Sequence, residues 1–323
     1  MIPVLIVGAG VAGLACARRL TQAGFQPILI DKGRGIGGRV ATREAEGLQF
    51  DHGAQYVTAK EAGFAAVLGD LAAMGYAAPW PQDGRDGAAR VRYVGTPGMA
   101  SLATGLARGL DVRQGVQVTS IRAGEDGWVV SAGETHYVAA RVVVTVPAPQ
   151  VMGLLGADHP LVALIAGVRM DPCLTLMAAI AADAPFVTRE MPDEPLAWIA
   201  QDCAKPGRPL PVAATRAGTG PVTWVAHASP GFSALHLEEE PAALAVRMVP
   251  MLCEQLGVTG NAVTHAAVHR WRYAQVAVPL GQPFLRSGNG SLYLGGDWCV
   301  GPRVESAWMS GTAIADDVLA HLP

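Results

Sequence analysis

Three glycines near the start of the chain have a spacing that lets a backbone approach a diphosphate. Gly8, Gly10 and Gly13 form the pattern GxGxxG, in which glycines tighten a turn and the following helix offers its N-terminal N–H groups to a pyrophosphate. Asp31 lies 18 positions beyond Gly13, where a carboxylate accepts hydrogen bonds from ribose hydroxyls. The set predicts a dinucleotide site. The alternatives are a structural glycine turn and an aspartate that only caps a turn.

The residues around this pattern narrow the choice of dinucleotide. Asp31 opposes a 2′-phosphate and so favours FAD or NAD over NADP, although Lys32 beside it weakens that exclusion. Gly37-Gly38-Arg39 and the distant Gly296-Asp297 have no role in a plain NAD domain, and they favour FAD. Arg39 suits forked contacts to phosphate oxygens, its alternative being a solvated surface arginine. The alternative for Asp297 is an Asx turn.

The elements that must position these residues follow from the hydrophobic pattern. A strand over Val4–Val7, a helix over Leu14–Ala23 and a strand over Pro27–Ile30 form a βαβ unit. A strand over Ser291–Leu294 and a helix over Val304–Leu319 repeat the order of strand, glycine turn and helix at the end of the chain. Between them we expect strands over 116–121, 127–130, 136–138 and 142–146, then a second lobe with strands over Leu174–Ala179 and Val222–Ala228 and a helix over Pro241–Leu256.

This order predicts an α/β protein with a nucleotide fold whose pieces lie at both ends of the chain. We expect a split Rossmann-type FAD-binding domain of the glutathione-reductase and p-hydroxybenzoate-hydroxylase kind, with a second α+β substrate domain. The predicted FAD-binding domain comprises residues 1–62, 95–155 and 268–323, and the predicted substrate domain comprises residues 63–94 and 156–267.

Several blocks spread over nearly the whole length carry a family resemblance. They are 4–13, 33–39, 51–59 (DHGAQYVTA), 94–99 (VGTPGM), 145–150 (TVPAPQ), 269–271 (HRW) and 296–308 (GDWC…RVESAW). The chain resembles the flavin-containing amine oxidase superfamily and, within it, the renalase-like branch of bacteria. That resemblance implies non-covalent FAD, and a substrate that is a 2- or 6-dihydro isomer of NAD(P)H, oxidised to NAD(P)+ while oxygen becomes hydrogen peroxide.

The resemblance also implies roles for individual residues. Ala12 and Gly13 would face the pyrophosphate, Asp31 the ribose, Arg39 the phosphates and Val118 the adenine. Asp297 would meet the ribityl or pyrophosphate region and Val304 the flavin pyrimidine, where the positive end of a helix begun by Gly301-Pro302 suits a reduced flavin. The full cofactor set is Gly8, Gly10, Ala12, Gly13, Asp31, Lys32, Gly38, Arg39, Ala54, Gln55, Val118, Gly296, Asp297, Arg303 and Val304. The substrate set is Gln55, Tyr56, Val57, Thr58, Ala59, Gly95 and Trp198.

No catalytic side chain is expected, because the flavin itself accepts the hydride. Amine oxidases of the superfamily usually carry a lysine near the flavin, and this chain has only Lys32, Lys60 and Lys205, none in a segment that aligns with it. Amine oxidation, or another small-molecule oxidase or desaturase activity, is therefore the second hypothesis. A non-catalytic flavin-binding protein is the third.

Several histidines, aromatic residues and a cysteine have either a structural or a functional interpretation. His52 and His269 are expected to be structural, and Tyr56 is either a pocket residue or a core aromatic. Cys299 is expected to be an inert buried thiol rather than a flavin attachment point. Four tryptophans wall an aromatic pocket or fill the core: Trp198, Trp271, Trp298 and Trp308.

Charge and composition exclude several classes of partner. A net charge of −3 provides no basic field for nucleic acid, and five cysteines without a CxxC pair suggest neither disulfides nor a metal site. Apolar runs are far shorter than the ~20 residues of a membrane span. We therefore expect a cytoplasmic protein, a monomer or weak homodimer, without a membrane or nucleic-acid partner, whose partners are a dihydronicotinamide dinucleotide and O2.

Overall fold

The computed structural model describes residues 1–81, 91–183, 185–209 and 221–321. Its first sheet has eight strands in the order β16-β17-β10-β1-β2-β7, with β9 paired to β10 and β8 to β9. The strands are β1 (Ile2–Val7), β2 (Ile28–Ile30), β7 (Asp111–Arg113), β8 (Ser120–Gly124), β9 (Gly127–Ala132), β10 (Thr135–Val144), β16 (Leu285–Arg286) and β17 (Leu292–Leu294). Strands from β17 to β7 along this order are parallel, which is the nucleotide-fold arrangement predicted from both ends of the chain.

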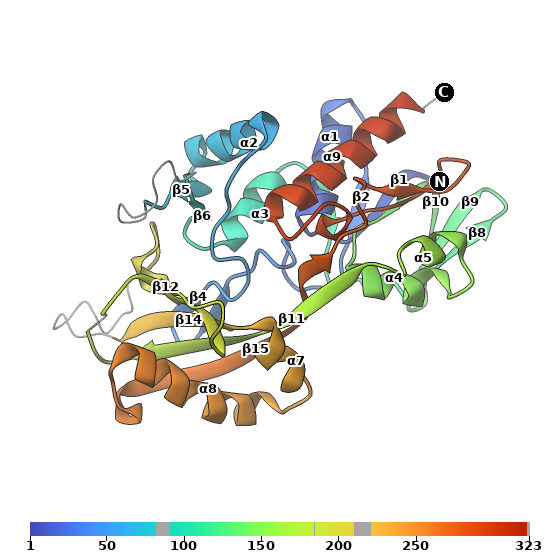
Figure 1. The fold of residues 1–323 in the computed structure, drawn as a ribbon. Helices are drawn as coiled ribbons and strands as arrows, with labels where there is room; N and C mark the ends of the chain where they lie inside the picture. The colour runs from blue at the N-terminus through green and yellow to red at the C-terminus, as the bar shows by residue number, and fades with distance from the viewer. Residues whose placement is uncertain (82–90, 184, 210–220, 322–323) are drawn as a thin grey trace.

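Two helices from opposite ends of the chain lie side by side on this sheet, as Figure 1 shows. Helix α1 (Val11–Gln22) follows β1 at once, and helix α9 (Val304–Ala320) closes the chain. A Cβ on Gly311 would lie 2.0 Å from the carbonyl oxygen of Ala12, so only glycine allows α9 to approach the first turn of α1. This contact joins the two halves of the nucleotide fold.

Two strand predictions in the middle of the chain are wrong in detail. The segment 116–119 is not a strand, because the Val116 N–H donates to the Asp31 carbonyl (2.8 Å) and the Gly115 N–H to the Gly33 carbonyl (3.0 Å), and β8 begins only at Ser120. The two strands expected over 136–138 and 142–146 are one ten-residue strand, β10, whose first half pairs with β9 and whose second half, 139–144, pairs with β1.

The second sheet has five antiparallel strands in the order β12-β13-β14-β11-β15. They are β11 (Arg169–Ile180), β12 (Thr188–Glu190), β13 (Leu196–Gln201), β14 (Val222–Ala228) and β15 (Val263–Val278). Helices α7 (Pro230–Leu235) and α8 (Pro241–Leu256) cover one face, where Leu244, Met248 and Leu252 are buried against the sheet (Figure 1). The predicted helix over 241–256 is confirmed with those bounds.

The remaining described elements are two hairpins, four helices and three short turns. They are the hairpins β3 (Arg43–Ala45) with β4 (Leu48–Phe50) and β5 (Ala77–Pro79) with β6 (Tyr93–Gly95), helices α2 (Ala62–Ala73), α3 (Ala100–Leu106), α4 (Ala148–Leu155) and α5 (Pro160–Leu164), and short turns η1 (Asp202–Ala204), η2 (Gly260–Ala262) and η3 (Asp297–Cys299). The predicted domain boundary at residue 268 falls inside β15, and the domain bounds stay a prediction. Across the described ranges, no helix is long and apolar enough to span a membrane.

Candidate functional site

The first turn of α1 offers free backbone donors toward open space. Gly10 is the N-cap and supplies no capping side chain, so the first N–H groups of the helix keep their capacity to bind an anion. A Cβ on Gly10 would meet no atom within 4 Å, whereas one on Gly13 would lie 2.0 Å from the Gly8 carbonyl oxygen. Gly13 thus permits the tight turn and Gly10 keeps it accessible, as a bound pyrophosphate requires.

Asp31 stands at the end of β2 beside this turn. Its Oδ2 accepts from the Ala9 N–H (2.7 Å) and its Oδ1 from the Gly33 N–H (2.6 Å), which fixes the carboxylate at the strand end. The backbone hydrogen bond from Val116 to Asp31 brings the segment of Val118, itself 9% exposed, to the same place. The residue predicted to face the ribose and the segment of the residue predicted to face the adenine are therefore neighbours. Lys32 instead extends to Gln150 (3.4 Å) on α4.

Arg39 and Asp297 meet in a two-armed ion pair. Arg39 Nη1 donates to Asp297 Oδ2 and Nη2 to Oδ1, both at 2.6 Å, and Nη1 also donates to the Ala274 carbonyl at 3.0 Å. Asp297 is 6% exposed, and Arg39 binds both of its carboxylate oxygens. The glycine-rich loop 33–39 lies against the GxGxxG turn, because the Gly37 N–H donates to the Ala9 carbonyl at 2.8 Å.

The segment 51–59 lies against the backbone of Arg39. The Ala54 N–H donates to the Arg39 carbonyl (2.9 Å), and Val57 pairs with Tyr93 through two backbone hydrogen bonds of 2.8 Å. Arg303, which caps α9, donates to the carbonyl and the hydroxyl of Thr58, both at 3.0 Å. The structure therefore brings the predicted substrate segment to the N-terminus of α9, next to Val304.

Gln55 belongs to a buried polar network that the sequence did not reveal. Lys205 is fully buried, and its Nζ donates to Gln55 Oε1 (3.0 Å), Asp202 Oδ1 (2.6 Å) and Asp51 Oδ2 (3.2 Å). Arg208 Nη2 also binds Asp51 Oδ2, and the Thr42 hydroxyl and the Met99 N–H donate to Asp51 Oδ1 at 2.7 and 2.8 Å. All three ammonium protons of Lys205 therefore have acceptors.

Charge compensation sets the protonation of this network. Burial disfavours the ionised form of Asp51, but the charges of Lys205 and Arg208 and its hydrogen bonds outweigh burial and lower its pKa below the ordinary value. Burial raises the pKa of Asp202, and Lys205 opposes that effect. Two cations and two carboxylates thus occupy one buried cluster, which is stable only while every member is paired.

Three imidazoles pack beside the same segment. His227 Nε2 lies 3.3 Å from Gln55 Nε2, and His52 stacks on Trp271 with ring centroids 5.3 Å apart and meets His269 edge-on at 4.7 Å. Burial, followed by the charge of Lys205, lowers the pKa of His227 to about 3, and burial lowers that of His52 to about 4. The Nδ1 of His52 is buried with no hydrogen-bond partner among the described residues. These rings are neutral at pH 7.

Tyr56 and Trp198, both predicted to face substrate, contact one another and share an arginine. Their ring centroids are 5.7 Å apart, and the guanidinium carbon of Arg92 lies 4.3 Å from the Tyr56 ring and 5.8 Å from that of Trp198. Tyr56 is thus part of this stack rather than a fully buried core residue. Sequence reasoning missed Arg92, whose only local signal is its position just before the VGTPGM block.

The four tryptophans do not wall a single pocket. Trp298 is fully buried in the core around β10, and its Nε1 donates to the Val146 carbonyl (3.0 Å). Trp308 packs on Phe64 (5.5 Å), Trp271 on His52, and Trp198 on Tyr56. Burial raises the pKa of the Cys299 thiol to about 12, in keeping with an inert thiol.

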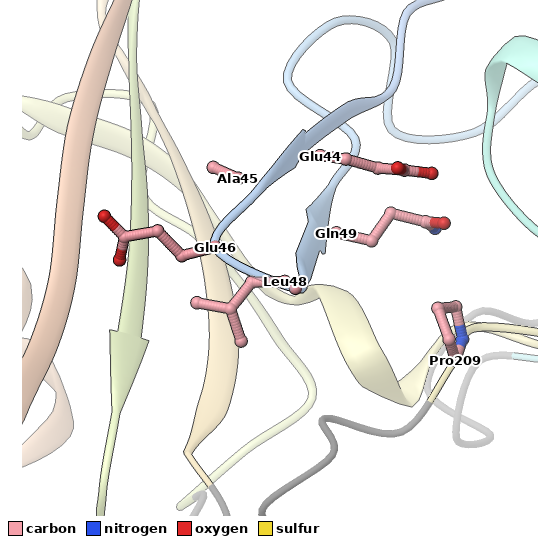
Figure 2. A pocket seen from close by; sticks show the side chains of 7 residues that line it. Glu44, Ala45, Glu46, Leu48, Gln49 and Pro209 are labelled. Atoms are coloured by element: carbon pink, nitrogen blue, oxygen red, sulfur yellow. The ribbon is translucent and has the colours of Figure 1, made fainter.

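A hollow of about 420 Å³ lies at the β3–β4 hairpin, away from these residues. Figure 2 shows Glu44 and Gln49 extending to one side of the hairpin, and Glu46 to the other. Pro209 completes its lining, which includes none of the predicted cofactor or substrate residues. The hollow is therefore separate from the dinucleotide site.

Fold and site together define an oxidoreductase with a Rossmann-like dinucleotide domain. Residues 6–69 match the model of the NAD(P)-binding Rossmann-like domain, and residues 63–319 match that of the flavin containing amine oxidoreductases. The chain belongs to this flavin containing amine oxidoreductase family. The family implies FAD as the cofactor, and the open, uncapped turn at Gly10 with Asp31 beside it fits its dinucleotide part.

Solved structures share the fold over the whole chain. A protein from Exiguobacterium sp. 255-15 assigned as a protoporphyrinogen oxidase superposes with a TM-score of 0.73 at 13% identity, covering 99% of each chain. Putrescine oxidase bound to putrescine superposes with a TM-score of 0.68 at 14% identity, again covering 99% of each chain. At these identities the likeness shows the fold alone.

Curated relatives match over short stretches. The 4,4'-diaponeurosporene oxygenase of Staphylococcus haemolyticus (strain JCSC1435) is 44% identical over 55 residues, which are 17% of this chain and 11% of that protein. Polyamine oxidase 1 of Oryza sativa subsp. japonica is 42% identical over 57 residues, which are 17% of this chain and 11% of that protein. The match thus spans about a tenth of these curated relatives.

Proposed function

We propose that this flavoenzyme is an oxidase of 2- and 6-dihydro isomers of NAD(P)H, of the renalase-like kind. The overall reaction would be dihydro-NAD(P) + O2 + H+ → NAD(P)+ + H2O2. A hydride leaves the substrate ring, and its two electrons with two protons reduce oxygen to hydrogen peroxide. FAD, when bound, supplies the hydride-accepting ring.

The observation that carries the proposal is the saturated state of Lys205. Its ammonium lies beside the substrate segment, yet each of its three protons has an acceptor on Gln55, Asp51 or Asp202. A lysine held in this way has no donor left to orient a water molecule. It serves instead to fix the side-chain amide of Gln55.

The neighbouring imidazoles also supply little base strength. With pKa values of about 3 and 4, His227 and His52 hold a proton too weakly to be effective general bases at neutral pH. Oxidation of a protonated amine requires loss of a proton before or with the hydride. A dihydropyridine releases hydride without first losing a proton, so it suits a site whose residues only position the substrate.

Anaerobic stopped-flow mixing tests the proposal. The FAD-loaded enzyme is mixed with borohydride-generated NADH isomers, with normal NADH and with putrescine, and the flavin absorbance near 450 nm is followed. We expect rapid bleaching by the isomers alone, and hydrogen peroxide formation at one equivalent per substrate in air. Bleaching by putrescine but not by the isomers would overturn the proposal.

Amine oxidation is the second candidate, favoured by the fold shared with putrescine oxidase. It predicts flavin reduction by amines whose rate rises with pH as the amine loses its proton. A flavin that no donor reduces would instead favour a binding protein.

A further inference from the structure

The arginines around the substrate segment differ in one respect. Three of them are each paired with a buried carboxylate: Arg39 with Asp297, Arg208 with Asp51 and Arg303 with Glu305. Among the residues that the structure describes, Arg92 pairs with Glu190 alone, at 3.5 Å, and the Glu190 side chain is 58% exposed. A contact this long with a solvated carboxylate neutralises little of the guanidinium charge.

The position of Arg92 is nevertheless fixed. Its guanidinium lies over Tyr56 and beside Trp198, with its side chain only 17% exposed. Aromatic rings bind the flat face of a guanidinium and leave the N–H groups at its edge available for forked contacts to oxygen. The stack therefore presents a preoriented cation beside the predicted substrate segment 51–59.

A second unmatched donor belongs to the same stack. The indole Nε1 of Trp198 is buried without an acceptor in the described part of the chain. Buried donors are rarely left without an acceptor. In the described part of the chain the indole N–H therefore has no oxygen acceptor, and the guanidinium has only the solvated Glu190 carboxylate.

We propose that Arg92, with Trp198, forms an anion subsite that binds a phosphate group of the substrate. This inference rests on the proposed function, because a dihydronicotinamide dinucleotide brings such a group and a simple amine does not. The phosphate is either the bridging pyrophosphate or, in the NADP series, the 2′-phosphate. An arginine here would repel a cationic amine and attract either phosphate.

Binding to the oxidised, FAD-loaded enzyme tests the subsite without turnover. Isothermal titration with ADP-ribose, 2′-phospho-ADP-ribose and adenosine compares the native chain with Arg92→Gln and Arg92→Lys. We expect Arg92→Gln to weaken ADP-ribose binding about 10- to 100-fold, as loss of a charge-assisted pair does, and to leave adenosine unchanged. Arg92→Lys should fall between, since it keeps charge but not the fork. An effect confined to 2′-phospho-ADP-ribose assigns the subsite to the 2′-phosphate.

Arg189→Gln is the matched control. Arg189 also lies over an aromatic ring, 4.1 Å from the Phe186 centroid, but it binds Gln255 and no predicted site residue. Its removal should leave every binding constant unchanged. FAD content and melting temperature verify that each variant is folded.

Two different failures are distinguishable. Equal binding of both ADP-ribose and 2′-phospho-ADP-ribose by the native chain and Arg92→Gln, or no binding of either by the native chain, overturns the subsite. Intact ADP-ribose binding that depends on Arg92, with no flavin reduction by any dihydronicotinamide isomer, keeps the subsite and overturns the proposed function.

Discussion

Arg39 and Asp297 lie 258 positions apart, and their side chains form a two-armed ion pair with both N–O distances at 2.6 Å. The pair joins the glycine-rich loop after β2 to the turn that precedes α9. It thereby connects two segments that both carry predicted cofactor residues. The Arg39 side chain is 30% exposed and that of Asp297 8%, so Asp297 depends more on its partner.

This pair predicts non-additive substitutions. Arg39→Gln leaves a nearly buried carboxylate without its cation and should destabilise the protein by about 2–4 kcal/mol and reduce retained FAD. Asp297→Asn should cost less. The double variant should be less harmful than the sum, because residues in contact show coupling of ~0.5–3 kcal/mol. Urea unfolding and the ratio of absorbance at 450 and 280 nm measure both effects, and strict additivity would show that the pair carries no coupling.

The Lys205 network predicts a large loss of stability when the buried ammonium group is removed. Lys205→Met should lower the free energy of unfolding by roughly 3–5 kcal/mol, since it leaves Asp51 and Asp202 buried near each other with one fewer cation. Adding Asp202→Asn should recover part of the loss. Lys60→Met, at an exposed position, is the control and should change stability by less than about 0.5 kcal/mol. A Lys205→Met protein as stable as the control would contradict the network.

Stability should fall on acidification below about pH 6.5. The folded-state pKa values of His227 and His52, about 3 and 4, lie below the ordinary value of 6.5, so the unfolded chain binds more protons in between. Their contribution is fully present above pH 6.5 and is lost as the pH falls toward 3. Each imidazole adds a slope of at most about 1.4 kcal/mol per pH unit. Denaturation at pH 7, 6 and 5 should give a shallower slope for His227→Gln than for the native chain, and equal slopes would contradict the prediction.

The approach of α9 to α1 predicts a strict need for glycine. Gly311→Ala places a methyl group 2.0 Å from the Ala12 carbonyl oxygen, so the helices must separate at the cost of roughly 1–3 kcal/mol. FAD retention should fall with it, since Ala12 belongs to the turn predicted to bind the diphosphate. Gly69→Ala on α2 has open space around its Cβ position and should be neutral or slightly stabilising. Thermal melts with and without added FAD compare the two, and equal behaviour would exclude the steric argument.

The sequence by itself determined the features that are local in the chain. These features depend on residue spacing over a few to about thirty positions, so the hydrophobic and glycine pattern predicts them directly. They are the GxGxxG turn, Asp31 at the next strand end, helix 241–256 and the family blocks. It also placed the nucleotide fold at both ends of the chain. It misplaced the strand near 116 because an apolar run does not specify its partner, and the backbone donors of that segment pair with the Asp31 loop instead.

Only the tertiary structure decided which charges meet. The sequence assigned no role to Lys205 or Asp51. The fold places Lys205 Nζ 3.2 Å from Asp51 Oδ2, although the two residues are 154 positions apart. Arg92 reached Tyr56 and Trp198 in the same way. The physical reason is that ion pairing and stacking depend on separation in space, whereas the order and register of strands that set this separation come from the whole buried core.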